Sequence, residues 1–201
     1  MPEASTSAAD ARLRRDTAQK LLAAAAAEFN EEGFGGTDTN KIARRAGFAP
    51  QTFYRWFADK TEIFIRVYED WQQQELGILR KLLAENAPDA RLVQACVAHH
   101  RAYLRFRRSL RQLAAENDRV RAARAASRLR QIAFLQQMGT SPSDAGRLGA
   151  VLLQIERLSD ALAEEEFADM GLAPGAAEGV LADLIHELRA GRGAPGAGES
   201  D

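Results

Sequence analysis

Two short apolar patterns, separated by a glycine and a proline, constrain the fold of this 201-residue chain more than any other feature. Ile42, Ala43 and Ala46 recur at spacings of three and four, which is the period of one face of a helix. Gly47 can adopt the positive φ angle that ends a helix sharply, and Pro50 is suited to the first turn of the next helix. The segment therefore predicts two short helices joined by a tight turn.

The second of these helices has one apolar and one polar face. Phe53, Trp56 and Phe57 lie at the spacing i, i+3, i+4, so we expect them to be buried. The side chains left on the exposed face are Gln51, Thr52, Tyr54 and Arg55. Hydrogen-bonding side chains of these types suit base edges and phosphates, as in a DNA-binding helix-turn-helix. The same pair of helices also fits an ordinary corner between helices in a protein of another class.

Composition favours helices and excludes several classes of protein. The chain has 61 alanine and leucine residues but 20 valine, isoleucine and threonine residues, whereas sheets draw on the β-branched types. A single cysteine, Cys96, excludes an internal disulfide framework and a multi-cysteine zinc site. No apolar run approaches the ~18 residues that span a membrane, and the N-terminus lacks the pattern of a secretory signal. We therefore expect an all-α, cytoplasmic protein that does not bind a membrane.

Prolines and glycines divide the chain into about nine expected helices, and Thr37 or Asp38 can cap the second of them. The expected helices are 12–33, 38–46, 50–57, 60–86, 88–107, 109–115, 117–139, 141–170 and 174–191. Near residue 60 the pattern changes from short helices to longer amphipathic ones. We predict disordered tails at 1–11 and 192–201, with an N-terminal head at 12–59 and a larger helical body at 60–191.

Around these helices the sequence resembles the tetracycline-repressor-like (TetR/AcrR) family of transcriptional regulators. In that family an Ala-rich helix ends in Phe-x-x-x-Gly-Phe, which is matched at residues 29–34. The family continues with a Thr and a later Ile-Ala-x-x-Ala-Gly, to which residues 37–47 are similar. It then has Thr-hydrophobic-Tyr-x-aromatic-Phe and a Lys, to which residues 52–60 are similar. The resemblance covers residues 17–68. It implies a three-helix helix-turn-helix DNA-binding head, followed by an effector-binding and dimerisation body.

The resemblance also implies which side chains meet DNA. Gln51 and Arg55, one turn apart, are expected to read bases, because Gln suits adenine and Arg suits guanine. Phosphate contacts are expected from Thr39, Asn40, Lys41, Tyr54 and Lys60, and Thr52 is expected to meet a phosphate or a base edge.

Four positions depart from the family's pattern. Ala49 replaces the usual Ser, so the helix expected at 50–57 loses its side-chain cap. Glu28 stands where an apolar residue is usual. Pro50 and Gln51 stand where many relatives have a polar and a small residue. Pro50 is included among the expected DNA-contact residues. Because of Pro50 and Gln51, we expect the DNA sequence that this chain binds to differ from those bound by its relatives.

The body is expected to form a homodimer and to bind an effector. Apolar residues at steps of three and four run along the last two helices, and the family pairs these helices with those of a second copy. The expected interface residues are Leu148, Leu152, Ile155, Leu181, Leu184 and Leu188. A monomer core is the alternative. A small-molecule pocket is expected from the resemblance, lined by Trp71, Cys96, His100, Tyr103 and Phe134.

The resemblance implies a sequence-specific transcriptional regulator, a repressor that an unidentified small-molecule effector releases from a palindromic operator. We expect no enzyme, because the chain lacks a Gly-rich phosphate loop, a nucleophile elbow and a His–carboxylate–Ser spacing. No cofactor or metal is expected, since Cys96 and His100 alone do not make a metal site. A DNA-packaging protein that ignores sequence is the remaining alternative.

The arginine-rich segment 101–130 has two interpretations. It holds ten arginines against two acidic residues, whereas residues 151–201 hold three arginines against eleven acidic residues. The segment is expected to be solvated surface that the acidic C-terminal helices partly neutralise. The sharper alternative is a site for an anionic effector such as an acyl-CoA or a phosphorylated metabolite.

Overall fold

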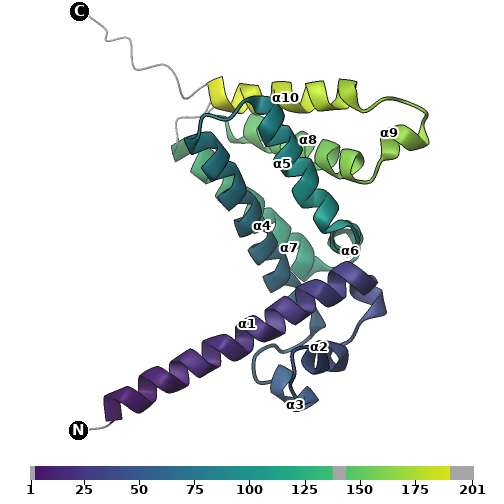
Figure 1. Ribbon diagram of the computed structural model, residues 1–201. Helices are drawn as coiled ribbons and strands as arrows, with labels where there is room; N and C mark the ends of the chain where they lie inside the picture. Colours follow the sequence, from purple (N-terminus) through teal and green to yellow (C-terminus); the bar gives the residue numbers. More distant parts are fainter. Residues whose placement is uncertain (1–2, 138–143, 191–201) are drawn as a thin grey trace, which may run out of the picture. The chain divides into compact units, whose positions relative to one another are not determined.

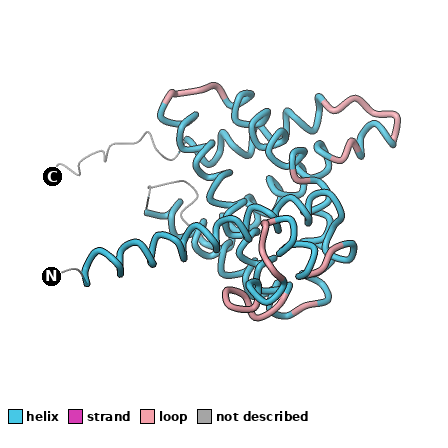
Figure 2. The backbone as a smooth tube through the Cα atoms, turned by 60° about the horizontal axis from the view of Figure 1, so that its bottom comes forward, coloured by secondary structure: helices cyan, strands magenta, loops and turns pink. Residues whose placement is uncertain are grey.

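The computed structural model describes residues 3–137 and 144–190, and over these residues it contains ten helices and no strand (Figures 1 and 2). The all-α prediction is confirmed. The helices are α1 (Glu3–Gly36), α2 (Thr39–Arg45), α3 (Pro50–Phe53), α4 (Lys60–Ala84), α5 (Asp89–Ala102), α6 (Leu104–Glu116), α7 (Asp118–Gln137), α8 (Ala145–Ala163), α9 (Glu166–Asp169) and α10 (Gly175–Ala190).

Several helices differ from their expected bounds for local backbone reasons. Helix α1 begins at Glu3 rather than at residue 12, and the expected tail at 192–201 lies outside the described residues. Helix α3 ends at Phe53 because the next amides bond three residues back, as from Trp56 N–H to the Phe53 carbonyl at 2.9 Å. Helix α8 ends early, and Glu165 follows in the left-handed conformation with φ 62°.

The chain folds as two compact units. The first, which we call the head unit, comprises Met1–Gln72 and Arg105–Arg121. The second, the body unit, comprises Gln73–Leu104 and Ala122–Asp201. Helix α4 therefore begins in the head unit and ends in the body unit, and most of α6 belongs to the head unit. The DNA-binding elements expected at 12–59 fold together with a segment that follows them by some fifty residues.

An aromatic cluster forms the core of the head unit. The ring of Phe64 lies 5.0 Å from Phe29 and 5.2 Å from Phe34 between ring centres, both edge-on. Phe106 of α6 adds a third contact with Phe64, at 5.0 Å. Phe53 of α3 is completely buried, as expected from its position on the apolar face. These rings fasten α1, α4 and α6 to one another, because large aromatic pairs dominate core packing.

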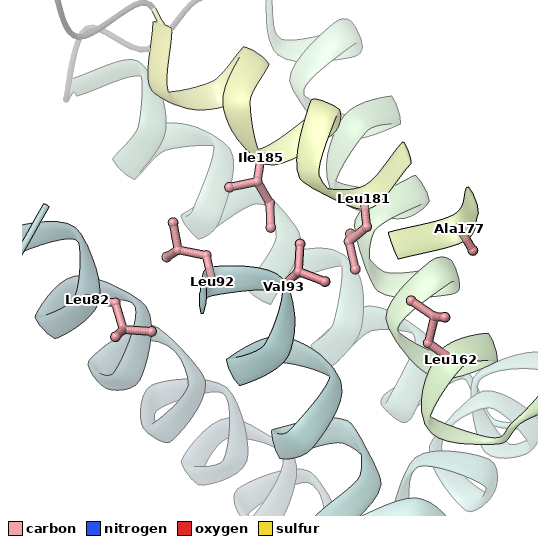
Figure 3. Close-up of a cluster of buried hydrophobic side chains, with 7 residues drawn as sticks. All are labelled: Leu82, Leu92, Val93, Leu162, Ala177, Leu181 and Ile185. Atoms are coloured by element: carbon pink, nitrogen blue, oxygen red, sulfur yellow. The ribbon is translucent and has the colours of Figure 1, made fainter. Parts of the chain in front are cut away.

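A second apolar cluster holds together α4, α5, α8 and α10 in the body unit (Figure 3). Its buried residues are Leu82, Leu92, Val93, Leu162, Ala177, Leu181 and Ile185. Ala177, Leu181 and Ile185 recur at every fourth residue, so one face of α10 is turned into the core of its own chain. The residues adjacent to these three in the sequence lie on other faces of α10, where they can contact groups outside this core.

Candidate nucleic-acid interface

Helix α2 begins at a capped N-terminus. Asp38 is extended, and its carboxylate accepts a hydrogen bond from the Lys41 N–H at 2.8 Å. This hydrogen bond lowers the pKa of Asp38 below its ordinary value, so the carboxylate stays ionised at the positive end of the helix. Of the two cap residues that the sequence allows, Asp38 is therefore the one used. The hydroxyl of Thr37 has a different role, which is described below.

The cap leads to a stability prediction. Asp38→Ala is expected to lower the free energy of unfolding by ~0.5–2 kcal/mol, because an amide of the first turn loses its acceptor. Asp38→Asn is the matched control, since an asparagine caps nearly as well. Urea unfolding of the three proteins measures the difference. A loss as large for the Asn variant as for the Ala variant would contradict the capping role.

The turn between α2 and α3 has the geometry that the glycine predicts. Gly47 takes a φ of 80°, and its N–H bonds the Arg44 carbonyl at 3.0 Å. The next amide, Phe48 N–H, bonds the Ala43 carbonyl at 2.9 Å. This pair of bonds is the Schellman ending of a helix, which requires a left-handed residue at the glycine. Helix α2 therefore passes into α3 through a turn that fixes the angle between them.

Helix α3 and the turn that follows it, which holds Tyr54 and Arg55, expose the side chains expected to face DNA. Gln51, Tyr54 and Arg55 are exposed and Thr52 is half-buried, while Phe53 and Phe57 are buried. Trp56, expected to be buried, is half-buried. Within the described part of the chain, no hydrogen bond or ion pair occupies the side chains of Gln51 and Arg55. Both remain available to a ligand on the polar face of the helix.

Two of the expected phosphate contacts meet each other. The hydroxyl of Thr39 lies 2.9 Å from the hydroxyl of Tyr54, which links the first turn of α2 to the end of α3. Nearby, the ammonium group of Lys41 donates to the Gly36 carbonyl at 2.9 Å, and Asn40 is exposed. The structure thus brings Thr39 and Tyr54 together where α2 begins and α3 ends, while Lys41 reaches back to the end of α1. Each retains solvent access, so none is lost as a candidate DNA contact.

Lys60 has a different environment from the other candidates. Its ammonium group donates to the carbonyls of Phe34 at 2.7 Å and Thr37 at 2.8 Å, and lies 4.1 Å from the centre of the Phe34 ring. Burial lowers the pKa of Lys60, although the charge of Asp38 opposes the shift. These contacts fasten the start of α4 to the segment between α1 and α2. These contacts give the Lys60 side chain a structural role, and we expect this role rather than the phosphate contact that the resemblance implies, although nothing in the structure tests the phosphate contact.

A conservative removal of this ammonium group separates the two roles. Lys60→Met is expected to lower the free energy of unfolding by ~1.5–3 kcal/mol, since two carbonyls lose a charged donor. At a temperature where the variant is fully folded, we expect its affinity for DNA to stay close to that of the unchanged protein. Unchanged stability together with weaker binding to every duplex would contradict the structural role and would assign Lys60 to a phosphate.

The turn between α3 and α4 is fixed by a reciprocal pair of acidic side chains. Asp59 accepts from the Glu62 N–H at 2.8 Å, and Glu62 accepts from the Ala58 N–H at 2.6 Å. The guanidinium group of Arg119 donates to Asp59 at 2.6 Å and lowers the pKa of this carboxyl. A residue from the start of α7 thereby supports the exit from α3.

Helix α6 holds the end of α1, a role that the sequence analysis missed. The hydroxyl of Ser109 accepts from the Phe34 N–H at 3.0 Å, and Arg105 donates to the Glu31 carbonyl. Gly33 permits this approach, because it takes a φ of 72° and a β-carbon at that position would lie 3.3 Å from the Ser109 hydroxyl. Nothing in the local pattern around residues 105–109 signals these long-range contacts.

The residues expected to line an effector pocket fall into both units. Trp71 belongs to the head unit, where the guanidinium group of Arg107 lies 4.5 Å from the centre of its ring. Cys96 is buried in the body unit, and burial with the nearby charge of Glu75 raises its pKa well above the usual range. Phe134 is half-buried beneath the guanidinium group of Arg80, at 4.7 Å. Their role in binding an effector stays a prediction.

A buried polar cluster surrounds the expected pocket residue His100. Its Nδ1 lies 2.8 Å from a carboxylate oxygen of Asp160, and its Nε2 lies 3.1 Å from a carboxylate oxygen of Glu75. The cluster joins α4, α5 and α8. Tyr103, the last expected pocket residue, donates its hydroxyl to Gln74 at 3.2 Å. Over the described residues, no group of three potential ligands has the arrangement of a metal site.

The expected dimer residues differ in their accessibility. Leu148 and Leu181 are completely buried within the single chain, so they are core residues of the protomer. Ile155 packs against the body cluster. The other three, Leu152, Leu184 and Leu188, are half-buried. Two exposed residues outside the expected interface set lie on the same helices: Leu153, which is 56% exposed, and Val180, which is 50% exposed.

The arginine-rich segment is engaged largely by the chain's own groups. In the body unit, Arg124 donates to Glu156 at 3.0 Å, Arg128 donates to the same carboxylate, and Arg101 donates to the Leu162 carbonyl at 3.2 Å. These contacts favour the interpretation of the segment as a neutralised surface over its interpretation as an anion site.

None of the described helices is long and apolar enough to cross a membrane.

Comparison with known proteins gives the same assignment for the N-terminal part of the chain. Residues 21–67 match the family model of the bacterial regulatory proteins, tetR family. A segment of 71 residues is 34% identical to the uncharacterized HTH-type transcriptional regulator YdgC of Bacillus subtilis (strain 168). That match covers 35% of this chain and 36% of the relative, so the chain matches about a third of the length of that protein.

The fold is shared over most of the chain. A TetR-family transcriptional regulator from Rhodococcus sp. superimposes with a TM-score of 0.67 and 15% identity, covering 87% of this chain and 98% of that one. A TetR-family regulator from Mesorhizobium loti MAFF303099 gives 0.57 at 19% identity, covering 87% of this chain and 95% of that one. At these identities the likeness establishes the architecture of both units.

Proposed function

We propose that this chain, whose residues 21–67 match the tetR family of bacterial regulatory proteins, is a DNA-binding transcriptional regulator of that family and acts as a dimer that recognises an inverted-repeat operator. The family consists of regulators rather than enzymes, in agreement with the sequence analysis. The observation that carries the proposal is the polar face formed by α3 and the turn directly after it. Gln51 and Arg55 are exposed there and unoccupied by any partner in the described chain.

Direct base reading is assigned to these two side chains. An arginine can bond a guanine, and a glutamine an adenine, through two hydrogen bonds in the major groove. We assign the phosphates to Thr39, Asn40, Lys41, Thr52 and Tyr54, with Pro50 contributing apolar contact at the start of α3. These contacts carry little sequence information, but they set the register of the protein on the duplex.

The dimer is assigned to the face of α8 and α10 that lies outside the core of the protomer. Val180, Leu184 and Leu188 recur at every fourth residue of α10, one helical face away from the buried Leu181. Leu152 and Leu153 add apolar surface on α8, which packs against α10. An exposed apolar face on two adjacent helices is suited to a second copy of itself, because a two-fold interface is self-complementary.

The regulatory part of the proposal is release from DNA by a small molecule that binds the body unit. Support comes from the buried polar cluster of Glu75, His100 and Asp160, because small-molecule sites commonly combine apolar walls with a few polar groups. A ligand that binds the DNA-free conformation more tightly weakens DNA binding by some factor, and DNA must weaken the binding of that ligand by the same factor.

A ligand screen followed by a DNA titration tests this regulatory proposal. Compounds that raise the melting temperature of the protein are titrated into its complex with operator DNA. We expect at least one of them to weaken operator binding by ~5–150-fold. Stabilising compounds that leave operator affinity unchanged would contradict release by those ligands.

A further inference from the structure

A single carboxylate holds both ends of α2 against α1. One oxygen of Glu28 accepts the Thr37 hydroxyl at 2.7 Å, and the other accepts the Arg45 guanidinium group at 3.2 Å. Thr37 comes just before the Asp38 cap, and Arg45 is the last residue of α2. The carboxylate therefore restrains this short helix at its start and at its end.

The surroundings of Glu28 make these contacts effective. The Glu28 side chain is 13% exposed and Thr37 is buried, so the bond between them is largely shielded from bulk water, whereas the Arg45 side chain is 35% exposed. The more exposed Glu31, at 56%, forms a two-bond pair with the same guanidinium group. The hydrogen bonds that Arg45 donates, first to Glu31 and then to Glu28, raise the pKa of its guanidinium group. The guanidinium group is thus committed to α1 rather than to a phosphate.

We propose that Glu28 is a positioning residue for DNA recognition: by fixing α2 at both ends, it sets the orientation in which α3 presents Gln51 and Arg55 to the bases. The link from α2 to α3 is the Schellman turn at Gly47, whose two backbone bonds pass any rotation of α2 on to α3. This inference rests on the proposed function, because it assigns a role within DNA binding.

Positioning has a signature that stability alone does not share. Bonds to base edges need accurate placement, whereas attraction to phosphates depends on charge and tolerates small rotations. Loss of the Glu28 contacts therefore weakens binding to the operator and leaves binding to random duplexes unchanged or slightly stronger. Binding to random duplexes becomes slightly stronger in variants that lose the negative charge of Glu28.

The test compares Glu28→Leu with Glu28→Gln, measured on operator and random duplexes at a temperature where each protein is fully folded. Both variants lack the negative charge. The amide of the glutamine can accept from Arg45 and donate to the Thr37 hydroxyl oxygen, while leucine can do neither. We expect the leucine variant to bind the operator about tenfold more weakly and the glutamine variant to stay within about twofold of the unchanged protein.

Thr37→Val provides a second measurement that does not depend on the folding of the leucine variant. Valine keeps the shape of threonine but lacks the hydroxyl, so operator binding is again expected to fall while random binding does not. In the Glu28→Leu background the same change should have no further effect, because the shared bond is already lost.

Equal operator affinity for all of these variants overturns the proposal, as does an equal loss for the leucine and glutamine variants. Failure of the proposed function has a different result. In that case the unchanged protein itself shows no preference for any sequence over random duplexes.

Discussion

Replacing Leu153 and Val180 together by glutamate is expected to convert the protein from dimers into monomers and to abolish operator binding. Both side chains are at least half exposed in the single chain, so the charges do not disturb the core of the protomer. In a two-fold interface each substitution appears twice, and each buries an unpaired charge. A monomer contacts one half-site at a time, which lowers operator affinity by about 10²-fold or more.

Light scattering and operator titration measure this pair of effects. The matched control is Leu129→Glu, which places the same charge on α7 at a leucine that is 64% exposed. The control is expected to remain a dimer with unchanged affinity. If the double variant stays dimeric, or if the unchanged protein is a monomer at micromolar concentration, the assignment of the interface to α8 and α10 is wrong.

Arg55→Ala is expected to remove most of the preference for the operator while leaving the fold intact. The arginine is exposed, so its loss leaves no cavity. Truncation of an arginine that bonds a guanine through two hydrogen bonds costs ~1–3 kcal/mol at each half-site, and it relaxes the base preference at that position. Affinity for random duplexes should fall much less, because it reflects the total charge rather than one base contact.

Arg66→Ala is the control for this loss of charge. Arg66 is an exposed arginine of α4 whose guanidinium group pairs with Glu69 at 3.0 Å. Its replacement is expected to change operator affinity by about twofold at most. Anisotropy titrations with operator and random duplexes compare the two variants. If Arg55→Ala weakens both duplexes to the same extent, Arg55 contacts a phosphate and does not read a base.

Local sequence patterns predicted the interface elements well, because short-range rules determine them. Gly47 adopts the positive φ that its position requires, and Asp38 caps α2 as its spacing allows. Phe53 and Phe57 are buried, while Gln51 and Arg55 are exposed, as helical periodicity indicates. In each case the pattern that determines the structure spans only a few consecutive residues.

Long-range contacts could not be predicted in the same way. Ser109 and Arg105 reach the end of α1 from more than seventy residues away, and no periodicity encodes that distance. Glu28 is partly an exception, since the sequence already showed that it stands where the family usually has an apolar residue. Its partners Thr37 and Arg45 became evident only when α1 and α2 were seen packed together.

The dimer residues show a different limit. Periodicity located the apolar stripes of the last two helices correctly, but it does not say which stripe faces the chain's own core. Leu148 and Leu181 belong to that core, whereas Leu153 and Val180 remain exposed. The distinction depends on how α5 packs against α8 and α10, which is a property of the folded body unit.

Selection of bound sequences from a pool of random duplexes, with the mass of each complex determined, tests whether this protein is a dimer that reads a DNA sequence. We expect enrichment of an inverted repeat whose half-sites are centred one helical turn, ~10–10.5 base pairs or a multiple of it, apart. Protein should bind this repeat as one or more dimers, and the enriched bases should change when Gln51 or Arg55 is replaced. A pool that remains random after several rounds, with binding that depends only on salt, would contradict it.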